Sequence, residues 1–386
     1  MKMVKLDEVI RRCQTREDRY DTDLEFYVGG EHFETGQVEL AGRGRIAGST
    51  IGPMFYYGFK PGDFLLVSRN PHLKKAARVD FPGICSEKTF VLETKDPKVL
   101  LPDFLPWVLQ NDRFWDYAQA NRHGSTNFFI NWSTLADYEF PLPEIGKQEK
   151  ISNVLWEAQH VRRCYRQQMA ACDDLVKSRF IEMFGSLGRG SSRFKKARLD
   201  SIAQTRLGKM LDKKQQTGEH PAHYLANHNV QWFQFDLDEL ETMDFSDDDR
   251  KEFALRDGDL LMCEGGEVGR CAIWHNQLEN CFFQKAIHRV RCDTNIVLPE
   301  YLAWHFKIAA DEGLLVKHTN ASTIAHLSGA KLKALQIVLP PIDDQHEFVF
   351  FSDQIDKSKF ALQKTLDDLD AMTRKLMSEE LGLGNV

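Results

Sequence analysis

Two stretches of this chain carry apolar residues at the spacing of a long amphipathic helix. Residues 146–183 and 343–377 contain no proline. The second stretch has apolar residues every seven positions, at Phe348, Ile355, Leu362, Leu369 and Leu376, with Phe351, Leu366 and Met372 widening the stripe. The first stretch repeats this register with smaller or more polar residues, at Ile151, Ala158, Tyr165, Cys172 and Arg179. Sustained seven-residue spacing predicts that the two helices pack on each other as a coiled coil.

Shorter elements precede each long helix in the same order. The predicted strands are rich in β-branched and aromatic residues and are bounded by Pro, Gly or Asn, and each predicted helix has Pro near its first turn. The first half predicts strands at 63–68 and 88–93, a helix at 102–120 and a strand at 138–142. The second half predicts strands at 259–263 and 286–291, a helix at 299–310 and a strand at 336–339.

Short motifs show that the second half repeats the first. With an offset of 197 residues, Leu101-Pro102 recurs as Leu298-Pro299, Ser125-Thr126 as Ser322-Thr323, and Pro143 to Gln148 as Pro340 to Gln345. This period is far too long for a solenoid repeat. We interpret it as the duplication of a domain together with the helix that follows it.

The predicted fold class is therefore α+β. Two similar mixed α/β modules, each with a twisted sheet, are separated by two long antiparallel coiled-coil helices, and a pseudo-two-fold axis relates the repeats. The expected segments are 1–145 for the first module, 146–184 for the first long helix, 185–197 for a linker, 198–342 for the second module, 343–380 for the second long helix and 381–386 for a tail.

Composition narrows the class of protein. The 386 residues suffice for two or three domains, and 28% of them are charged. We expect a cytoplasmic protein, because no run of 18 apolar residues occurs and the first residues lack a signal peptide. The eight cysteines include no C-x-x-C pair, so we expect free thiols and no metal site. The net charge of −7 disfavours phosphate binding unless basic residues gather locally.

Several motifs, taken in order, carry a family resemblance. They are the strand-to-helix segments 140–151 and 339–345, the end of the first long helix at 177–185, and the second-module segments 224–232, 255–262, 264–270 and 283–291. Over essentially its full length, the chain resembles the specificity subunits of type I restriction-modification systems.

This resemblance implies a function. The modules would be target-recognition domains, each binding one half of a split site in double-stranded DNA. The antiparallel helices would set the spacer between the half-sites and dock two copies of the methyltransferase subunit, and the restriction and motor subunits would join that core. The chain itself would catalyse nothing and hold no cofactor. Its partner subunits would use S-adenosylmethionine, ATP and Mg²⁺.

Candidate DNA contacts lie on predicted loops and strand ends, where side chains reach base edges and basic groups bind phosphates. In the first module they are Arg43, Arg45, Tyr56, Tyr57, Arg69, Lys74, Lys75, Arg78, Arg122, Ser125 and Thr126. In the second they are Lys209, Glu264, Glu267, Arg270, Gln284, Lys285, His318, Asn320, Ser322 and Thr323. Each residue could instead be a solvated surface residue, the Ser-Thr pairs could cap turns, and the two glutamates could hold Arg270.

Two other functions stay open at this point. Asp80 with Glu93 and Lys95 resembles the carboxylate layout of a Mg²⁺-dependent nuclease, although the second module has no counterpart. A coiled-coil scaffold with protein-binding modules would share the same helix pattern. The sequence has neither the Asn/Asp-Pro-Pro-aromatic motif of an adenine methyltransferase nor a P-loop.

Overall fold

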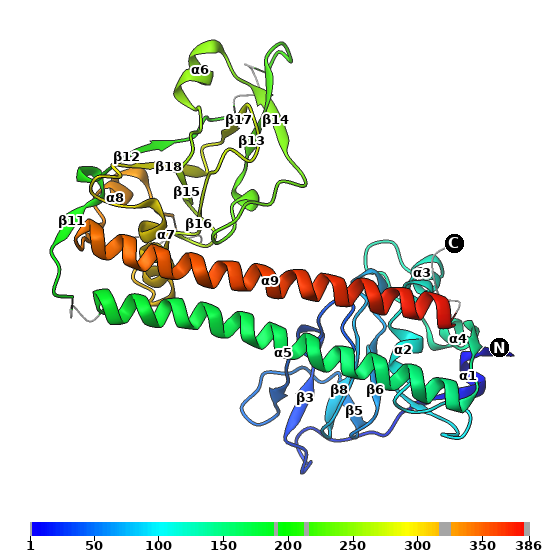
Figure 1. Cartoon of the computed structure of the whole chain (residues 1–386). Coiled ribbons are helices and arrows are strands. Elements are labelled where there is room, and N and C mark those ends of the chain that lie inside the picture. Colours follow the sequence, from blue (N-terminus) through cyan, green and yellow to red (C-terminus); the bar gives the residue numbers. More distant parts are fainter. Residues whose placement is uncertain (1, 189–191, 212–215, 316–325, 382–386) are drawn as a thin grey trace. The chain divides into compact units, whose positions relative to one another are not determined.

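The computed structural model describes residues 2–188, 192–211, 216–315 and 326–381 (Figure 1). The chain forms two compact units. Unit 1 comprises Met1–Arg166 and Gln363–Val386, and unit 2 comprises Gln167–Leu362. Each unit therefore holds one module and a part of both long helices.

The elements of the first half follow each other in this order. They are β1 (Lys2–Lys5), α1 (Leu6–Val9), β2 (Ile10–Cys13), β3 (Phe26–Val28), η1 (Gly30–His32), β4 (Gly44–Arg45), β5 (Phe55–Phe59), β6 (Phe64–Val67), η2 (Pro71–Leu73), β7 (Ala76–Arg78), β8 (Gly83–Ser86), β9 (Thr89–Thr94), α2 (Leu105–Leu109), α3 (Asp112–Ala120), α4 (Trp132–Ala136), β10 (Glu139–Leu142) and α5 (Ile145–Phe184).

The second half has a matching series. Its elements are β11 (Lys196–Arg198), η3 (Leu199–Ser201), β12 (Ala203–Leu207), β13 (Pro221–Leu225), η5 (Asn227–Asn229), β14 (Glu241–Asp244), α6 (Asp247–Glu252), β15 (Leu260–Cys263), β16 (Cys271–Ile273), β17 (Cys281–Phe283), β18 (Ile287–Cys292), α7 (Pro299–Asp311), α8 (Gly329–Lys333), β19 (Gln336–Val338) and α9 (Ile342–Leu381).

The sheets of the two units share most of their topology, although the second sheet has four strands in unit 1 (β4-β3-β8-β5) and three in unit 2 (β14-β13-β17). The strand order β2-β9-β6-β7 in unit 1 corresponds to β12-β18-β15-β16 in unit 2, and both sheets are antiparallel. A second sheet in each unit contains one parallel pair, β3 with β8 and β13 with β17. The pairs β1-β10 and β11-β19 complete the match. The duplication predicted from the sequence motifs is thus present in the fold.

Both faces are buried in the sheet β2-β9-β6-β7 of unit 1 and in the sheet β12-β18-β15-β16 of unit 2. In β6, Phe64 and Leu66 enter one apolar cluster and Leu65 enters another on the opposite face. In β15, Leu260 and Leu261 divide between two clusters in the same way. Because successive side chains of a strand point to opposite faces, burial of both faces explains the continuous apolar runs that predicted these strands.

The long helices α5 and α9 contribute to both cores. The beginning of α5 adds Ile151 and Leu155 to the core of unit 1, and its end adds Val176, Phe180 and Phe184 to the core of unit 2. Each helix has 40 residues. A helix with an amphipathic pattern supplies apolar side chains wherever a module lies against it.

The two helices run antiparallel where they pair (Figure 1). In unit 1, Lys147 pairs with Glu380 at 2.7 Å and Arg162 with Asp370 at 2.5 Å. In unit 2, Asp173 pairs with Lys359 at 2.5 Å and Arg179 with Glu347 at 2.7 Å. Residue numbers rise along one helix as they fall along the other, which confirms the predicted antiparallel packing. The expectation that Met372 widens the apolar stripe is wrong, since its side chain is 69% exposed.

The predicted helix at 102–120 is also interrupted. The chain forms α2 and α3, and Asn111 between them has an extended backbone. The Asn111 side chain accepts a hydrogen bond from the backbone N–H of Phe114 at 2.9 Å and donates to the carbonyl of Val108 at 2.6 Å. Asn111 therefore ends one helix and caps the next. Its counterpart in the uninterrupted α7 is Ile308, which cannot form these bonds.

One buried glutamine in each unit ties the start of a long helix to its module. Gln148 of α5 accepts a hydrogen bond from the backbone N–H of Leu101 at 2.9 Å and donates to the carbonyls of Val99 and Pro143. Gln345 of α9 makes the equivalent three bonds, to the N–H of Leu298 and the carbonyls of Ile296 and Pro340. Both glutamines are buried.

Two expectations from the sequence concern the free thiols and the absence of a long apolar segment. All eight cysteines are free thiols, and Cys263, Cys271 and Cys281 are buried among apolar side chains. No helix in the described part of the chain is long and apolar enough to cross a membrane.

Replacing Gln345 with Leu should lower the free energy of unfolding by about 3 kcal/mol, because a buried N–H and two carbonyls lose their partner. Urea unfolding followed by tryptophan fluorescence would measure this loss. Gln354→Leu, an exposed position on the same helix, is the matched control. Equal effects of the two substitutions would contradict the role assigned to Gln345.

Unit 2 should lose stability in acid. His305 is buried in α7, where its Nε2 accepts a hydrogen bond from the N–H of Val338 at 3.2 Å. Burial, with a smaller effect of Lys196, lowers the pKa of His305 from 6.5 to about 3. Below pH 6.5 the unfolded chain binds a proton that the folded chain does not. Stability is therefore complete above pH 6.5 and falls by up to about 1.4 kcal/mol per pH unit down to about pH 3. Urea unfolding at several pH values should show a shallower slope for His305→Gln, and an unchanged slope would refute this assignment.

Candidate DNA interface

In each unit, three chain segments meet at one end of the antiparallel sheet, which is β2-β9-β6-β7 in unit 1 and β12-β18-β15-β16 in unit 2. In unit 1, Val67 at the end of β6 lies opposite Thr89, and Cys13 at the end of β2 lies opposite Val91. The segments after β2 and β6 therefore meet the turn before β9. We call this end of the sheet, in either unit, the strand-end surface.

The strand-end surface of unit 1 is joined by backbone hydrogen bonds. The N–H of Ser68 donates to the carbonyl of Lys88 at 2.7 Å, and the N–H of Ile130 donates to the carbonyl of Ser68 at 2.9 Å. Ser68 thus links the turn 86–88 to the loop 121–130. Arg69 and Phe129 extend this link as an isolated antiparallel bridge.

Unit 2 makes the same bonds with other residues. The N–H of Glu264 donates to the carbonyl of Ala286 at 2.9 Å, and the N–H of Leu327 donates to the carbonyl of Glu264 at 2.8 Å. Gly265 and His326 form the corresponding bridge. The two units therefore present the same backbone surface with different side chains on it.

Five residues predicted in the first module lie on this surface. Arg69, Arg122, Ser125 and Thr126 are exposed, and the Arg122 guanidinium lies 4.3 Å from the centre of the Phe128 ring. The fifth, Tyr56, donates its hydroxyl hydrogen to Glu87 at 3.1 Å. Burial, followed by this hydrogen bond, raises the pKa of Tyr56. The surface can offer basic, hydroxyl and aromatic groups to a ligand.

Other predicted residues of the first module serve the fold. Tyr57 is buried in an apolar cluster, and its hydroxyl accepts a hydrogen bond from Gln14 at 3.3 Å. The Lys75 ammonium donates to the carbonyl of Gly30 at 2.6 Å, as the guanidinium of Arg270 in unit 2 donates to that of Asn227 at 3.0 Å. Gly30 and Asn227 begin the equivalent helices η1 and η5. Because both units keep this bond, we assign Lys75 and Arg270 a role in the fold. Each holds the hairpin that it belongs to, β6-β7 or β15-β16, against the short helix η1 or η5.

Three predicted arginines lie at the opposite end of the sheets. Arg78 pairs with Phe64 at the start of β6, and Arg45 pairs with Phe26, which lies beside the start of β8. Arg45 also forms an ion pair with Glu25 at 2.7 Å. Arg43 stacks on the Phe26 ring at 4.0 Å.

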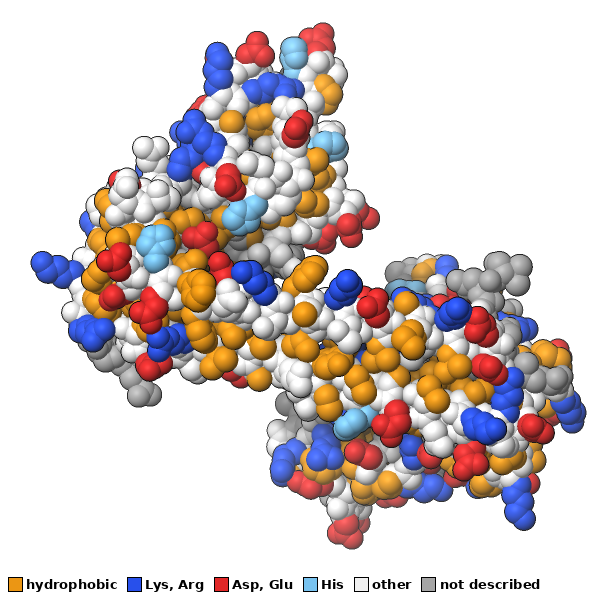
Figure 2. Space-filling view, viewed as in Figure 1, with side chains coloured by type: hydrophobic (Ala, Val, Ile, Leu, Met, Phe, Trp, Pro, Cys, Tyr) orange, Lys and Arg blue, Asp and Glu red, His pale blue; other side chains and the backbone are white. Residues whose placement is uncertain are grey.

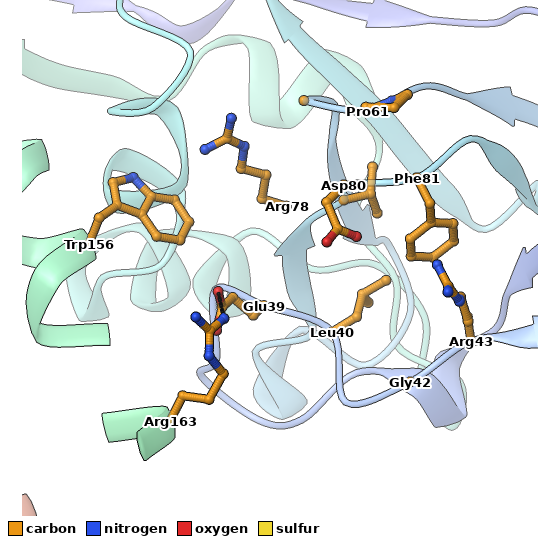
Figure 3. A pocket seen from close by; sticks show the side chains of 12 residues that line it. Glu39, Leu40, Gly42, Arg43, Pro61, Arg78, Asp80, Phe81, Trp156 and Arg163 are labelled. Carbon is orange, nitrogen blue, oxygen red and sulfur yellow. Dashed lines mark hydrogen bonds and ion pairs between the residues drawn. The ribbon is translucent and has the colours of Figure 1, made fainter. Parts of the chain in front are cut away.

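Arg43 and Arg78 line a groove of about 810 Å³ in unit 1 (Figure 3). Arg78 forms an ion pair with Asp103 at 2.7 Å, and Arg163 of α5 forms one with Glu39 at 3.2 Å. The carboxylate of Asp80 also faces the groove. Two of the three arginines that line the groove are thus paired with carboxylates, which disfavours a phosphate contact there. Lys74 is similarly paired, with Asp112 at 2.7 Å.

In unit 2, some of the predicted residues are exposed and others are engaged in hydrogen bonds within the fold. Gln284 and Lys285 lie in the turn before β18, where Lys285 is exposed and Gln284 is partly exposed, and Glu264, which follows β15, is also partly exposed. The Lys209 ammonium instead donates to the carbonyl of Asp244 and to Asp249, both at 2.6 Å, and its side chain is 11% exposed. His318, Asn320, Ser322 and Thr323 lie outside the described residues.

The Glu267 carboxylate is also engaged. It accepts a hydrogen bond from the indole of Trp232 at 2.5 Å and lies 3.7 Å from Arg270. Glu267 therefore lies within ion-pair distance of Arg270, and its negative charge belongs to this network. Lys88, which the sequence did not single out, is exposed on the strand-end surface of unit 1. Alignment of the two repeats, which places Lys88 beside the counterpart of Lys285, could have found it.

Two of the three residues of the nuclease hypothesis, Glu93 and Lys95, are bound to other partners. Glu93 accepts hydrogen bonds from Arg11 at 2.6 Å, Lys60 at 2.9 Å and Cys13 at 3.0 Å. Burial raises the pKa of Glu93, but these bonds outweigh burial and bring it to about 2. Lys95 donates to the carbonyl of Asp7. Within the described ranges, no cluster of three His, Cys, Asp or Glu residues could hold a metal ion.

Comparison with known proteins gives consistent matches. Residues 191–369 match the family model described as the type I restriction modification DNA specificity domain. The chain is 22% identical over 323 residues to the type I restriction enzyme EcoKI specificity subunit of Escherichia coli (strain K12), which covers 78% of this chain and 68% of that relative. The resemblance inferred from the sequence motifs is confirmed.

Two solved structures share the fold. A chain from the structural work on complex assembly and conformational transition of the type I R-M system gives a TM-score of 0.57 at 17% identity, with 99% of this chain and 96% of that chain covered. The type I restriction-modification S subunit from M. genitalium gives a TM-score of 0.51 at 14% identity, with 98% and 96% covered. At these identities the likeness supports the fold.

The two lysines at the strand-end surface of unit 2 should respond differently to substitution. Lys285→Ala should weaken binding to duplex DNA and lower the slope of log affinity against log salt by about 0.9, with stability unchanged. Lys209→Ala should lower the free energy of unfolding by roughly 1 to 3 kcal/mol, because Asp249 and the Asp244 carbonyl lose a buried donor. Fluorescence anisotropy at several salt concentrations and urea unfolding measure the two effects. A reversed pattern would overturn the distinction between the lysines.

Proposed function

We propose that this chain, whose residues 191–369 match the family model of the type I restriction modification DNA specificity domain, is the DNA sequence-specificity subunit of a type I restriction-modification complex. One observation carries the proposal. Two units with the same backbone present different side chains at the same strand-end surface. A protein that reads two different short sequences with one repeated scaffold needs this arrangement.

Each unit would bind one half of a bipartite site in double-stranded DNA. Basic groups such as Arg69 and Lys285 would contact phosphates, and polar groups such as Ser125 and Gln284 would reach base edges. The net charge of the whole chain is −7, but the charge that matters for phosphate contacts is local. The long helices would fix the spacing between the half-sites.

The partners would be the methyltransferase and restriction subunits of such a complex, with two copies of the methyltransferase subunit. The exposed faces of α5 and α9 offer a surface for them. Phe350 and Phe360 of α9 and Leu175 of α5 are exposed, and Figure 2 shows hydrophobic side chains among charged ones along these helices. Where exposed apolar groups form a large contiguous patch, they mark a site of protein interaction.

Catalysis would belong to the partners. They would bring S-adenosylmethionine, ATP and Mg²⁺, and this chain would bring the sequence preference. The hydrogen bonds that engage Glu93 and Lys95 favour this division over a Mg²⁺-dependent nuclease within the chain. The similarity to a specificity subunit along 78% of the chain favours it over a protein scaffold.

Genome-wide mapping of methylated adenines, in source cells with and without this gene, tests the proposal. We expect the deletion to remove methylation from one motif that consists of two short sequences around a fixed unspecified gap. Restoring the gene should restore the motif. An unchanged map, in cells whose methyltransferase partner is shown to be active, would refute the proposal. Cleavage or methylation of DNA by the purified chain alone would favour an enzyme.

A further inference from the structure

A tyrosine at the strand-end surface of unit 1 is exposed without serving the core. The segment after β2 leaves the sheet at this surface, because the end of β2 lies opposite the start of β9. It carries Tyr20, whose side chain is 83% exposed. An aromatic ring left in water loses the stabilisation that burial would give it. The question is what covers this ring in the working protein.

The turn that carries Tyr20 is held in one shape. The Asp18 carboxylate accepts a hydrogen bond from the N–H of Tyr20 at 2.9 Å, and the carbonyl of Asp18 accepts one from the N–H of Asp21 at 3.0 Å. Arg19 donates to the carbonyl of Ile51 at 2.6 Å and to the Tyr20 hydroxyl. A ring presented on a fixed turn costs little ordering entropy on binding.

Arginines lie beside the exposed ring. The Arg19 guanidinium is 4.4 Å from the centre of the Tyr20 ring, and the Arg16 guanidinium is 5.0 Å from the centre of the Tyr56 ring. These residues line a shallow recess of about 380 Å³. Glu17 and Asp18 also line it, but the Asp18 carboxylate is used within the turn. The recess therefore combines aromatic faces with two guanidinium groups and the Glu17 residue.

The segment is continuous with the strand-end surface. The N–H of Glu17 donates to the carbonyl of Tyr56, and the N–H of Gly58 donates to the carbonyl of Thr15, both at 2.9 Å. Tyr56 in turn donates to Glu87 of the turn before β9. A ligand lying on the proposed DNA surface would therefore reach the recess.

Unit 2 also exposes apolar side chains in the segment that follows the matching strand. After β12, Met210 is 62% exposed and Leu211 is 45% exposed. Their segment is bound to the strand-end surface, because the N–H of Lys209 donates to the carbonyl of Phe283 and the N–H of Lys285 donates to that of Lys209. Both units thus expose apolar groups after the same strand, with different chemistry in each.

We infer that the segment Arg16–Tyr20 is a DNA-contacting element in which the Tyr20 ring packs against bases of the half-site read by unit 1. Arg16 and Arg19 face the neighbouring phosphates, and Met210 with Leu211 takes the place of Tyr20 in unit 2. This inference rests on the proposed function. Duplex DNA is favoured over a protein partner because cations flank the ring and the recess continues the strand-end surface. Apolar and aromatic side chains contact base methyl groups and base steps in DNA grooves.

The test uses the chain assembled with its methyltransferase partner and a duplex carrying the methylated motif. Tyr20→Ala should weaken binding to this duplex roughly tenfold and leave binding to an unrelated duplex unchanged. Tyr20→Phe, which keeps the ring, should bind within about twofold of the wild type. Unfolding midpoints of both variants should equal that of the wild type, because the side chain is exposed.

Methylation maps of cells carrying the variants give a second readout. Tyr20→Ala should relax the sequence preference in one half of the motif, and Met210→Ser should relax it in the other half. An unchanged affinity and map for Tyr20→Ala, with the wild type still selective, would overturn this inference and leave the proposed function standing. Equal weakening on both duplexes would also overturn it, since the ring would then contact no bases. A wild-type complex without any sequence preference would instead refute the proposed function.

Discussion

In each unit, the joint between the module and the long helix depends on a buried glutamine side chain at the start of that helix. Gln148 and Gln345 each form three hydrogen bonds to backbone groups that no strand or helix satisfies. An apolar residue at either position would leave those groups buried and unpaired, which is costly. The amide therefore fixes the direction in which the helix leaves its module. The prolines that precede both glutamines, at Pro143 and Pro340, accept one of the three bonds with their carbonyls and so belong to the same joint.

Much of this fold could be predicted from the sequence, because local patterns encode it. The seven-residue spacing gave both long helices, and α5 begins at Ile145, one residue before the predicted start. The repeat motifs gave the matching sheets. The break at Asn111 was missed, since a helical pattern on both sides conceals a side chain that caps one helix and ends another. The exposure of Met372 was missed because an apolar stripe in the sequence does not show how much of its width the neighbouring helix covers.

The candidate site was less predictable, because a charged side chain gives no sign of its partner. Lys75 finds its acceptor at Gly30 and Lys209 at Asp249, far away in the sequence, so both resemble free surface cations until the fold is known. Tyr57 and Tyr56 are neighbours on one strand, yet alternation buries the first and leaves the second at the surface. Lys285 and Arg69 kept their predicted exposure. Residues that stay exposed therefore differ from residues that serve the fold in their position relative to the end of the sheet, and not in residue type.

The sharing of the long helices has a consequence for how the protein is made. The core of unit 1 is covered partly by Leu376 and Met377 of α9, and Arg162 of α5 is paired with Asp370. The ribosome makes the rest of unit 1 first and these residues last. At typical rates of synthesis, the first module waits roughly 10 to 40 s for the helix that completes it. During that interval its apolar face is open to water, to other nascent chains and to chaperones, while unit 2 can close as soon as the first half of α9 has emerged.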